Sequence, residues 1–293
     1  MLEPRPAAVV SSTAAEPRPC LNCGEPLRGP YCWKCGQEDL DLHRPLKQLA
    51  RDAVGDLLNL DTRFLRTLGP LLFRPGLLIR EYLAGRRVSF VPPLKMYLLA
   101  TLIFFGLVAL LPRQHFTVVR TTETFPKTLT PGVRFQLPTI DDQSSWFGQR
   151  IEEASDNAQK DPDRFGATVI ANLPRAFFLL LPAFALLLKL FYRKQDRYYL
   201  DHLIFALYFH AFVFTALTLR LPLTRSWMPQ WIETPLVLLL WTWLFLYLPI
   251  ALRHVYGGTW KKTLLKLAGL LYLYAVVFGV TAMMLVLTTL LWF

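Results

Sequence analysis

Four cysteines, arranged as two Cys-x-x-Cys-Gly motifs, constrain the N-terminal part of this chain more than any other feature. The first motif contains Cys20 and Cys23, the second contains Cys32 and Cys35, and eight residues separate them. A Cys-x-x-Cys turn presents two sulfur atoms along one edge of a tetrahedron, and a short hairpin can bring the second pair opposite the first. The spacing predicts a zinc-ribbon-like module over residues 19–38.

The number of ligands indicates what this zinc ion would do. Four thiolates fill a tetrahedral coordination sphere and leave no position for a catalytic water molecule. We therefore expect one structural Zn²⁺ per chain, contributing on the order of 10 kcal/mol to the folding of a segment too small for its own core. Gly24 and Gly36, which follow the motifs, permit the positive φ that such turns require. Two disulfides of a secreted domain are the alternative, but residues 1–19 lack the apolar core of a signal peptide.

Charged and aromatic residues surround the cysteines. Arg18, Arg28 and Lys34 are expected to offset the negative charge of the thiolates. Tyr31 and Trp33 are expected to pack over the hairpin rather than to stack on bases, which argues against a nucleic-acid partner.

The rest of the chain has the composition of a membrane protein. Hydrophobic residues make up 53% of the 293 residues and gather in runs without Lys, Arg, Asp or Glu. These runs are 96–111, 176–188, 202–219, 234–252 and 267–293. Most of these runs approach the roughly 20 residues that cross a bilayer core. The second run is too short alone, but it becomes long enough if its helix extends to Arg175 and Lys189 and these side chains reach opposite interfaces. We therefore expect an all-α multi-pass membrane domain over 93–293, with spans at 93–111, 173–192, 200–219, 232–252 and 265–293.

Positive charges predict the orientation of these spans. Cytoplasmic loops of membrane proteins are enriched in Lys and Arg. The segments 1–95, 192–198 and 253–262 are rich in these residues, and five spans place all three on one side. We expect a cytoplasmic N-terminus, an extracytoplasmic C-terminus and an extracytoplasmic loop over 112–172. The net charge of +11 reflects this bias and attraction to anionic lipids.

The segment before the first span is predicted to be partly helical. Residues 1–18 are rich in Pro, Ala and Ser and are expected to form a disordered tail. In the segment 39–92, an amphipathic helix is expected to begin at Pro45. Two further helices, 61–73 and 77–84, are expected on either side of a Pro-Gly turn.

Four arginines lie in or next to these last two helices. We expect Arg74, Arg80, Arg86 and Arg87 to contact the headgroups of membrane lipids. The alternative is pairing within the protein, for example with Glu81.

Three ionisable residues at the start of the third span form a candidate intramembrane polar site. Asp201, His202 and His210 stand out because an ionisable residue inside a span is costly and usually has a partner or a task. They are compatible with a proton relay or a second metal site. In the alternative interpretation, Asp201 and His202 lie at the interface near Arg197, and His210 makes a hydrogen bond between helices.

Several segments resemble one known family. The segments that carry the resemblance are 29–37, 68–76, 82–93, 201–210 and 251–260. They are similar to bacterial membrane proteins grouped as domain of unknown function 3667. The resemblance implies an N-terminal zinc ribbon ahead of several membrane helices in a bacterial inner membrane, and it implies no particular reaction.

Three classes of function follow. The sequence favours a regulatory or scaffold protein whose ribbon and arginine-rich helices bind a cytosolic protein partner or lipid headgroups, since nothing in it requires catalysis. A transporter or channel for a small solute or ion is supported by the polar residues at 201, 202, 210, 220 and 233 but weakened by only five spans without an internal repeat. A membrane enzyme acting on lipid or envelope substrates is the third class.

Overall fold

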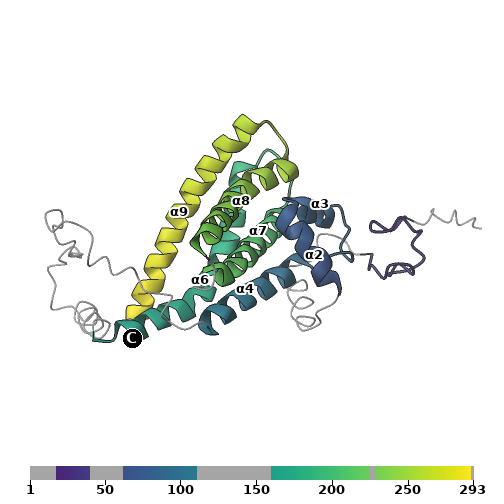
Figure 1. Ribbon diagram of the computed structural model, residues 1–293. Coiled ribbons are helices and arrows are strands. Elements are labelled where there is room, and N and C mark those ends of the chain that lie inside the picture. The colour runs from purple at the N-terminus through teal and green to yellow at the C-terminus, as the bar shows by residue number, and fades with distance from the viewer. Residues whose placement is uncertain (1–17, 40–61, 111–159, 225–228, 292–293) are drawn as a thin grey trace, which may run out of the picture.

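A computed structural model describes residues 18–39, 62–110, 160–224 and 229–291 of the protein (Figure 1). The predicted helix from Pro45, nearly all of the predicted tail and most of the predicted loop 112–172 lie outside the described residues. The elements in chain order are α2 (Thr62–Phe73), α3 (Leu77–Leu83), α4 (Pro93–Leu110), α6 (Pro162–Phe191), α7 (Tyr199–Arg220), η2 (Leu221–Thr224), α8 (Gln230–Tyr256) and α9 (Trp260–Leu291).

Five of these helices, namely α4, α6, α7, α8 and α9, are long and apolar enough to cross a membrane. This confirms the predicted all-helical multi-pass architecture. The main difference in bounds concerns α6, which begins at Pro162 rather than at 173. Its start is set by polar residues that hydropathy ignores: Asp161 Oδ1 accepts a hydrogen bond from the backbone N–H of Arg164 at 3.0 Å, and a proline fits the first helical position.

Helix α7 is the centre of the bundle. Buried residues make up 67% of its apolar stretch but only 11% of that of α9, so α7 is surrounded by protein while α9 largely faces outward. Helices α4 and α6 both pack on α7. The Phe214 ring of α7 contacts rings from both of these helices, and Phe212 stacks on Tyr247 of α8 with 3.5 Å between centroids. Such close packing is what holds helices together where no water is present.

Helix α9 runs antiparallel to α6, and the C-terminal end of the described chain lies beside the start of α6 (Figure 1). At the opposite end, the loop after α6 meets the end of α8. Gln195 Nε2 donates to the carbonyl of Tyr256 at 2.6 Å, and Arg197 donates to that of Val255 at 3.1 Å. The two short basic segments of the membrane domain therefore lie at one end of the bundle.

The short helices α2 and α3 are fixed against α7 and α8 (Figure 1). The indole N–H of Trp243 donates to the carbonyl of Leu72 at 2.7 Å, and His254 Nδ1 donates to that of Pro75 at 2.8 Å. Between α2 and α3, Gly76 has a φ of 83°, and a Cβ there would lie 3.2 Å from the carbonyl oxygen of Ala251. The turn before α3 therefore fits closely against the end of α8.

Candidate metal centre

Residues 18–39, called the metal module below, consist of two copies of the same turn. In the first copy, the backbone N–H of Cys20 donates to the carbonyl of Glu25, and the N–H of Gly24 donates to the carbonyl of Cys20, both at 2.8 Å. The second copy has the equivalent backbone bonds from Cys32 to Gln37 and from Gly36 to Cys32. Each copy closes with an antiparallel bridge, Pro19 to Pro26 or Tyr31 to Glu38. Gly24 and Gly36 have φ values of 78° and 71°, which confirms the expected need for glycine.

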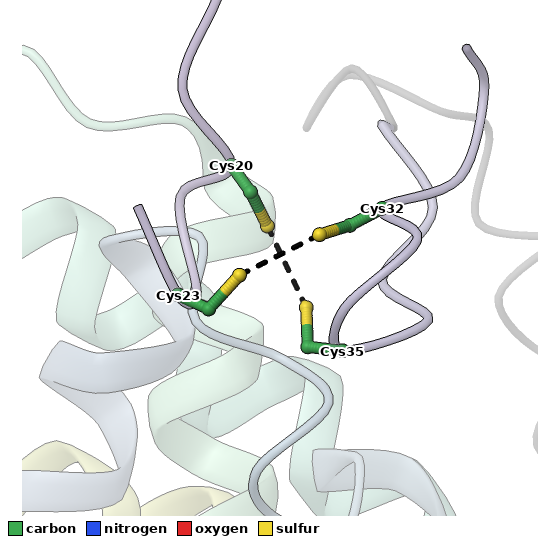
Figure 2. A group of neighbouring side chains, drawn as sticks. All are labelled: Cys20, Cys23, Cys32 and Cys35. Carbon is green, nitrogen blue, oxygen red and sulfur yellow. Dashed lines mark hydrogen bonds between the residues drawn. The ribbon is translucent and has the colours of Figure 1, made fainter. Parts of the chain in front are cut away.

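The four cysteine side chains point toward a common centre (Figure 2). All four sulfur atoms lie within 4.8 Å of one another. Cys20 Sγ is 3.6 Å from Cys35 Sγ, and Cys23 Sγ is 3.5 Å from Cys32 Sγ. A tetrahedron with zinc–sulfur bonds of about 2.3 Å has edges of about 3.8 Å, so the arrangement fits a metal ion held by four thiolates. A disulfide needs a separation of about 2.05 Å, and the four cysteines are free.

The surroundings of the sulfur atoms differ in their effect on deprotonation. The backbone N–H of Cys35 donates to the Cys32 sulfur and is the main reason that the pKa of Cys32 is lowered to about 7. At Cys23, the N–H of Glu25 also favours the thiolate, but desolvation and the neighbouring thiols outweigh it and raise the pKa of Cys23 to about 12. Crowded thiols resist losing all their protons together, and a bound cation removes that resistance.

The cations of the module are partly engaged elsewhere. Lys34 Nζ lies 3.2 Å from Glu25 Oε2, and this bond is the main cause of the raised pKa of Lys34. Arg18 lies 3.4 Å from a carboxylate oxygen of Asp39. Glu25 and Asp39 thus take up part of the charge of Lys34 and Arg18. Cys23 and Cys32 also contribute to the raised pKa of Lys34, in line with the expectation that it can offset the thiolates.

The metal module is attached to the turn between α3 and α4. Gln37 is buried, and its Nε2 donates to the carbonyl of Gly85 at 2.9 Å while its Oε1 accepts from the backbone N–H of Arg87 at 3.1 Å. Ser89 Oγ donates to Asn22 Oδ1 at 3.0 Å. Leu21 lies against Gly85, where a Cβ would come within 2.5 Å of Leu21 Cδ1. The first residues of the module and its last turn thus both contact the segment that leads into α4.

Two aromatic side chains of the module do not pack as expected. Tyr31 is 60% exposed and Trp33 is 66% exposed, so neither covers the hairpin. The expectation was wrong because the metal-type turn already closes the hairpin and leaves no apolar interior for two rings. A pair of exposed aromatic side chains remains on the surface of the module.

The four arginines predicted to meet lipid headgroups have different surroundings. Arg74 and Arg80 are exposed. Arg86 forms an ion pair with Glu81, and this hydrogen bond is the main cause of the lowered pKa of the Glu81 carboxyl. The Arg87 guanidinium lies 5.5 Å from the ring centroid of Tyr82. Arg86 thus has the partner named in the alternative interpretation, while Arg74 and Arg80 point outward.

The three polar residues of α7 do not share one site. Asp201 Oδ2 accepts from the backbone N–H of Tyr198 at 3.2 Å and so caps the helix. His202 is buried and hydrogen-bonds Tyr256 of α8 at 2.7 Å. His210 Nδ1 donates to the carbonyl of Ala206, and its Nε2 hydrogen-bonds Tyr274 of α9 at 3.0 Å.

Each histidine of α7 therefore joins that helix to another span.

The sequence alone assigned no contact to Gln37, Tyr256 or Tyr274, although the first two lie in segments that carry the family resemblance. Gln37 directly follows the second motif, and it lay within a segment that carried the family resemblance, which was the available signal. The tyrosines could have been noticed because a hydroxyl inside an apolar helix needs a hydrogen-bond partner.

Comparison with known proteins adds one finding. Residues 61–105 match the model of a family described as Protein of unknown function (DUF3667). This match supports the family that the sequence resembles. The matched stretch contains α2, α3, most of α4 and the Gly85–Ser89 turn on which the metal module lies. No curated protein and no solved structure matches the chain.

Proposed function

We propose that this protein is a regulatory or scaffold protein of a bacterial inner membrane, in which a zinc-bound module presents a protein-binding surface at the start of the first span. The observation that carries the proposal is the attachment of the metal module through Gln37 to the backbone of Gly85 and Arg87. A surface held at a fixed place on a membrane domain suits a docking role, because little ordering remains to be done when a partner binds.

Zinc is the metal that best suits the site. Four cysteine sulfurs in a tetrahedral arrangement are typical of zinc or iron–sulfur sites, and a closed set of four thiolates is typical of structural zinc. In a reducing cytoplasm, cysteines stay available as thiolates for a metal. Bound zinc would hold the two turns together, and no chemical step is assigned to it.

The binding surface that we propose contains Tyr31 and Trp33. Both rings are more than half exposed, and they lie on either side of Cys32, which the metal would fix. Exposed tyrosine and tryptophan are enriched at protein–protein interfaces, where they act as anchors. The proposed partner is a cytosolic protein. Headgroup contacts by Arg74 and Arg80, which are exposed, would add contact with anionic lipids.

The proposed orientation has the N-terminus in the cytoplasm and the C-terminus outside. It is supported by five candidate spans and by the position of both short basic segments at one end of the bundle. Reporter fusions at residues 195 and 258 are expected to give a cytoplasmic signal, and fusions at 140 and 293 an extracytoplasmic one. A cytoplasmic signal at 293 would contradict this orientation.

Site-specific crosslinking tests the docking role. A photoreactive amino acid replacing Tyr31 in the full-length protein, in cells, is expected to give a discrete crosslinked protein. Trp33→Ala should weaken that product because it removes the neighbouring anchor, whereas Arg28→Ala, a change at another exposed residue of the module, should leave it unchanged. Gln37→Ala should weaken it if attachment to the membrane domain matters.

Crosslinking that Trp33→Ala leaves unchanged, or that Arg28→Ala weakens as much as Trp33→Ala does, would contradict a specific surface at these rings. Uptake of solutes by proteoliposomes containing the purified protein would instead favour the transporter alternative.

A further inference from the structure

An open pocket of about 420 Å³ lies where α8 ends and α9 begins. Its lining residues are Ile250, Arg253, His254, Gly257, Gly258 and Trp260. The two glycines have φ values of 69° and 96°, and a Cβ at either one would meet nothing within 4 Å. The turn between the helices therefore leaves room beside its backbone for a group from outside the chain.

The charge of this pocket is positive. The Arg253 guanidinium lies 4.4 Å from the ring centroid of Trp260, and within the described parts of the chain no carboxylate forms an ion pair with it. No acidic residue is among the lining residues. Lys261 and Lys262 follow directly and are exposed. The guanidinium charge is thus available to a ligand.

The neighbouring histidine is held in a defined orientation. His254 Nδ1 donates to the carbonyl of Pro75 at 2.8 Å, and because a carbonyl only accepts, the proton lies on Nδ1. Nε2 is on the opposite edge of the ring and takes no part in that bond. The turn around Gly76 packs against the histidine, since a Cβ added at Gly76 would lie only 3.1 Å from His254 Cβ. The pocket is therefore lined by the end of α8, the turn after it and the start of α9, and the turn before α3 holds one lining residue, His254, in place.

We propose that this pocket binds a phosphate group, with Arg253 as the donor to its oxygens, Trp260 as an aromatic wall and His254 as part of the lining. The planar, permanently charged guanidinium matches phosphate oxygens in two parallel hydrogen bonds, and tryptophan is enriched at the headgroup level of membranes. The expected source is the headgroup of an anionic phospholipid, with inorganic phosphate as the soluble source of the same chemistry. None of the arginines 74, 80, 86 and 87, and no residue of the metal module, is among the residues that line this pocket.

Lipid titration of the full-length protein tests the proposal. Purified protein in detergent is titrated with phosphatidylglycerol or phosphatidylcholine, and bound lipid is counted by native mass spectrometry. We expect phosphatidylglycerol to bind more tightly, and Arg253→Gln to weaken it about tenfold, which is the loss of about 1.4 kcal/mol. The matched control is Arg193→Gln, which removes the same charge from an exposed residue of the loop 192–198 and should leave the affinity unchanged.

Two further measurements separate the possible outcomes. Arg253→Lys keeps the charge but not the paired hydrogen bonds, so it should give an intermediate affinity even if Arg253→Gln is unstable. Inorganic phosphate is added as a competitor. If the protein binds phosphate, Arg253→Gln weakens that binding and phosphatidylglycerol is not preferred over phosphatidylcholine, the pocket is a phosphate site for a soluble ligand. Equal losses at Arg253 and Arg193, or binding that neither Arg253 variant changes, would overturn the proposal.

Discussion

The metal module and helix α7 are ordered by opposite means. The module has two isolated bridges, few buried side chains and four cysteines around one centre. Helix α7 has buried aromatic side chains along its length and neighbours on several sides. We therefore expect order in the module to depend on a metal ion, which its four cysteines could hold, and on a few hydrogen bonds, whereas order in α7 depends on many small packing contacts. One part of the molecule can accordingly lose its structure while the other keeps it.

Removal of the metal should have the largest effect and should be confined to the module. Cys23→Ser combined with Cys35→Ser removes two of four ligands, and the module loses binding energy on the order of 10 kcal/mol. Elemental analysis should show about one zinc per chain in the unmodified protein and a loss of that zinc in the variant. Hydrogen exchange should rise over 18–39 and stay low in α7.

If exchange in α7 rose together with that in the module, the two regions would be coupled and the comparison would fail. Absence of metal in the unmodified protein, with disulfides detected in cells, would refute the zinc assignment.

A cavity in α7 should have the second-largest effect, and it should destabilise the helical bundle rather than the metal module. Phe214 is buried and contacts the rings of Tyr97, Phe104, Phe105 and Phe177 at 5.1–6.2 Å between centroids. Phe214→Ala should lower the free energy of unfolding by about 3–5 kcal/mol, measured by denaturation in detergent, and leave the zinc content unchanged.

The matched change in an outward-facing helix is Phe278→Ala in α9, where the side chain is 45% exposed. Phe278→Ala should lower the free energy of unfolding much less than Phe214→Ala, because fewer contacts are lost. Equal losses at the two positions would show that α7 is not the centre of the bundle.

A substitution in the joint between the two regions should have a smaller effect. Gly85 has a φ of 85° and touches Leu21, so Gly85→Ala adds both a clash and backbone strain of about 1–3 kcal/mol. We expect zinc to remain bound while hydrogen exchange increases at residues 85–89. Gly29→Ala is the control, because a Cβ at Gly29 would meet nothing within 4 Å; comparable exchange in both variants would contradict the attachment.

The ion pair between Glu81 and Arg86 should have the smallest effect, visible through pH. The folded-state pKa of Glu81 is lowered by the hydrogen bond from Arg86, so this pair stabilises the fold above the unfolded pKa of about 4.3, and the stabilisation is lost as pH falls through the folded-state value. The contribution is small because the Arg86 side chain is 45% exposed and water screens the pair.

Thermal stability measured from about pH 6 to about pH 3 should therefore fall slightly more steeply in the unmodified protein than in Glu81→Gln. Identical slopes would indicate that the pair does not stabilise the fold.

Local patterns were sufficient to predict much of the fold and the cysteine cluster. The spacing of Cys20, Cys23, Cys32 and Cys35 predicted a common site because two-residue turns fix where neighbouring sulfur atoms point. Five apolar runs predicted five candidate spans because a helix must be about 20 residues long to cross a bilayer. The start of α6 was missed because it is set by the Asp161 side chain, which caps the helix, and a cap leaves no trace in hydropathy.

Only the tertiary structure decided which separated residues meet. The attachment of Gln37 to Gly85, the pairing of His210 with Tyr274 and the exposure of Trp33 each depend on contacts, or missing contacts, between segments distant in the chain. The sequence by itself determined the elements, because residue spacing and hydrophobic length act within one segment. The joints between elements depend on how helices and turns pack against one another, and the periodicity of a single segment carries no information about its neighbours.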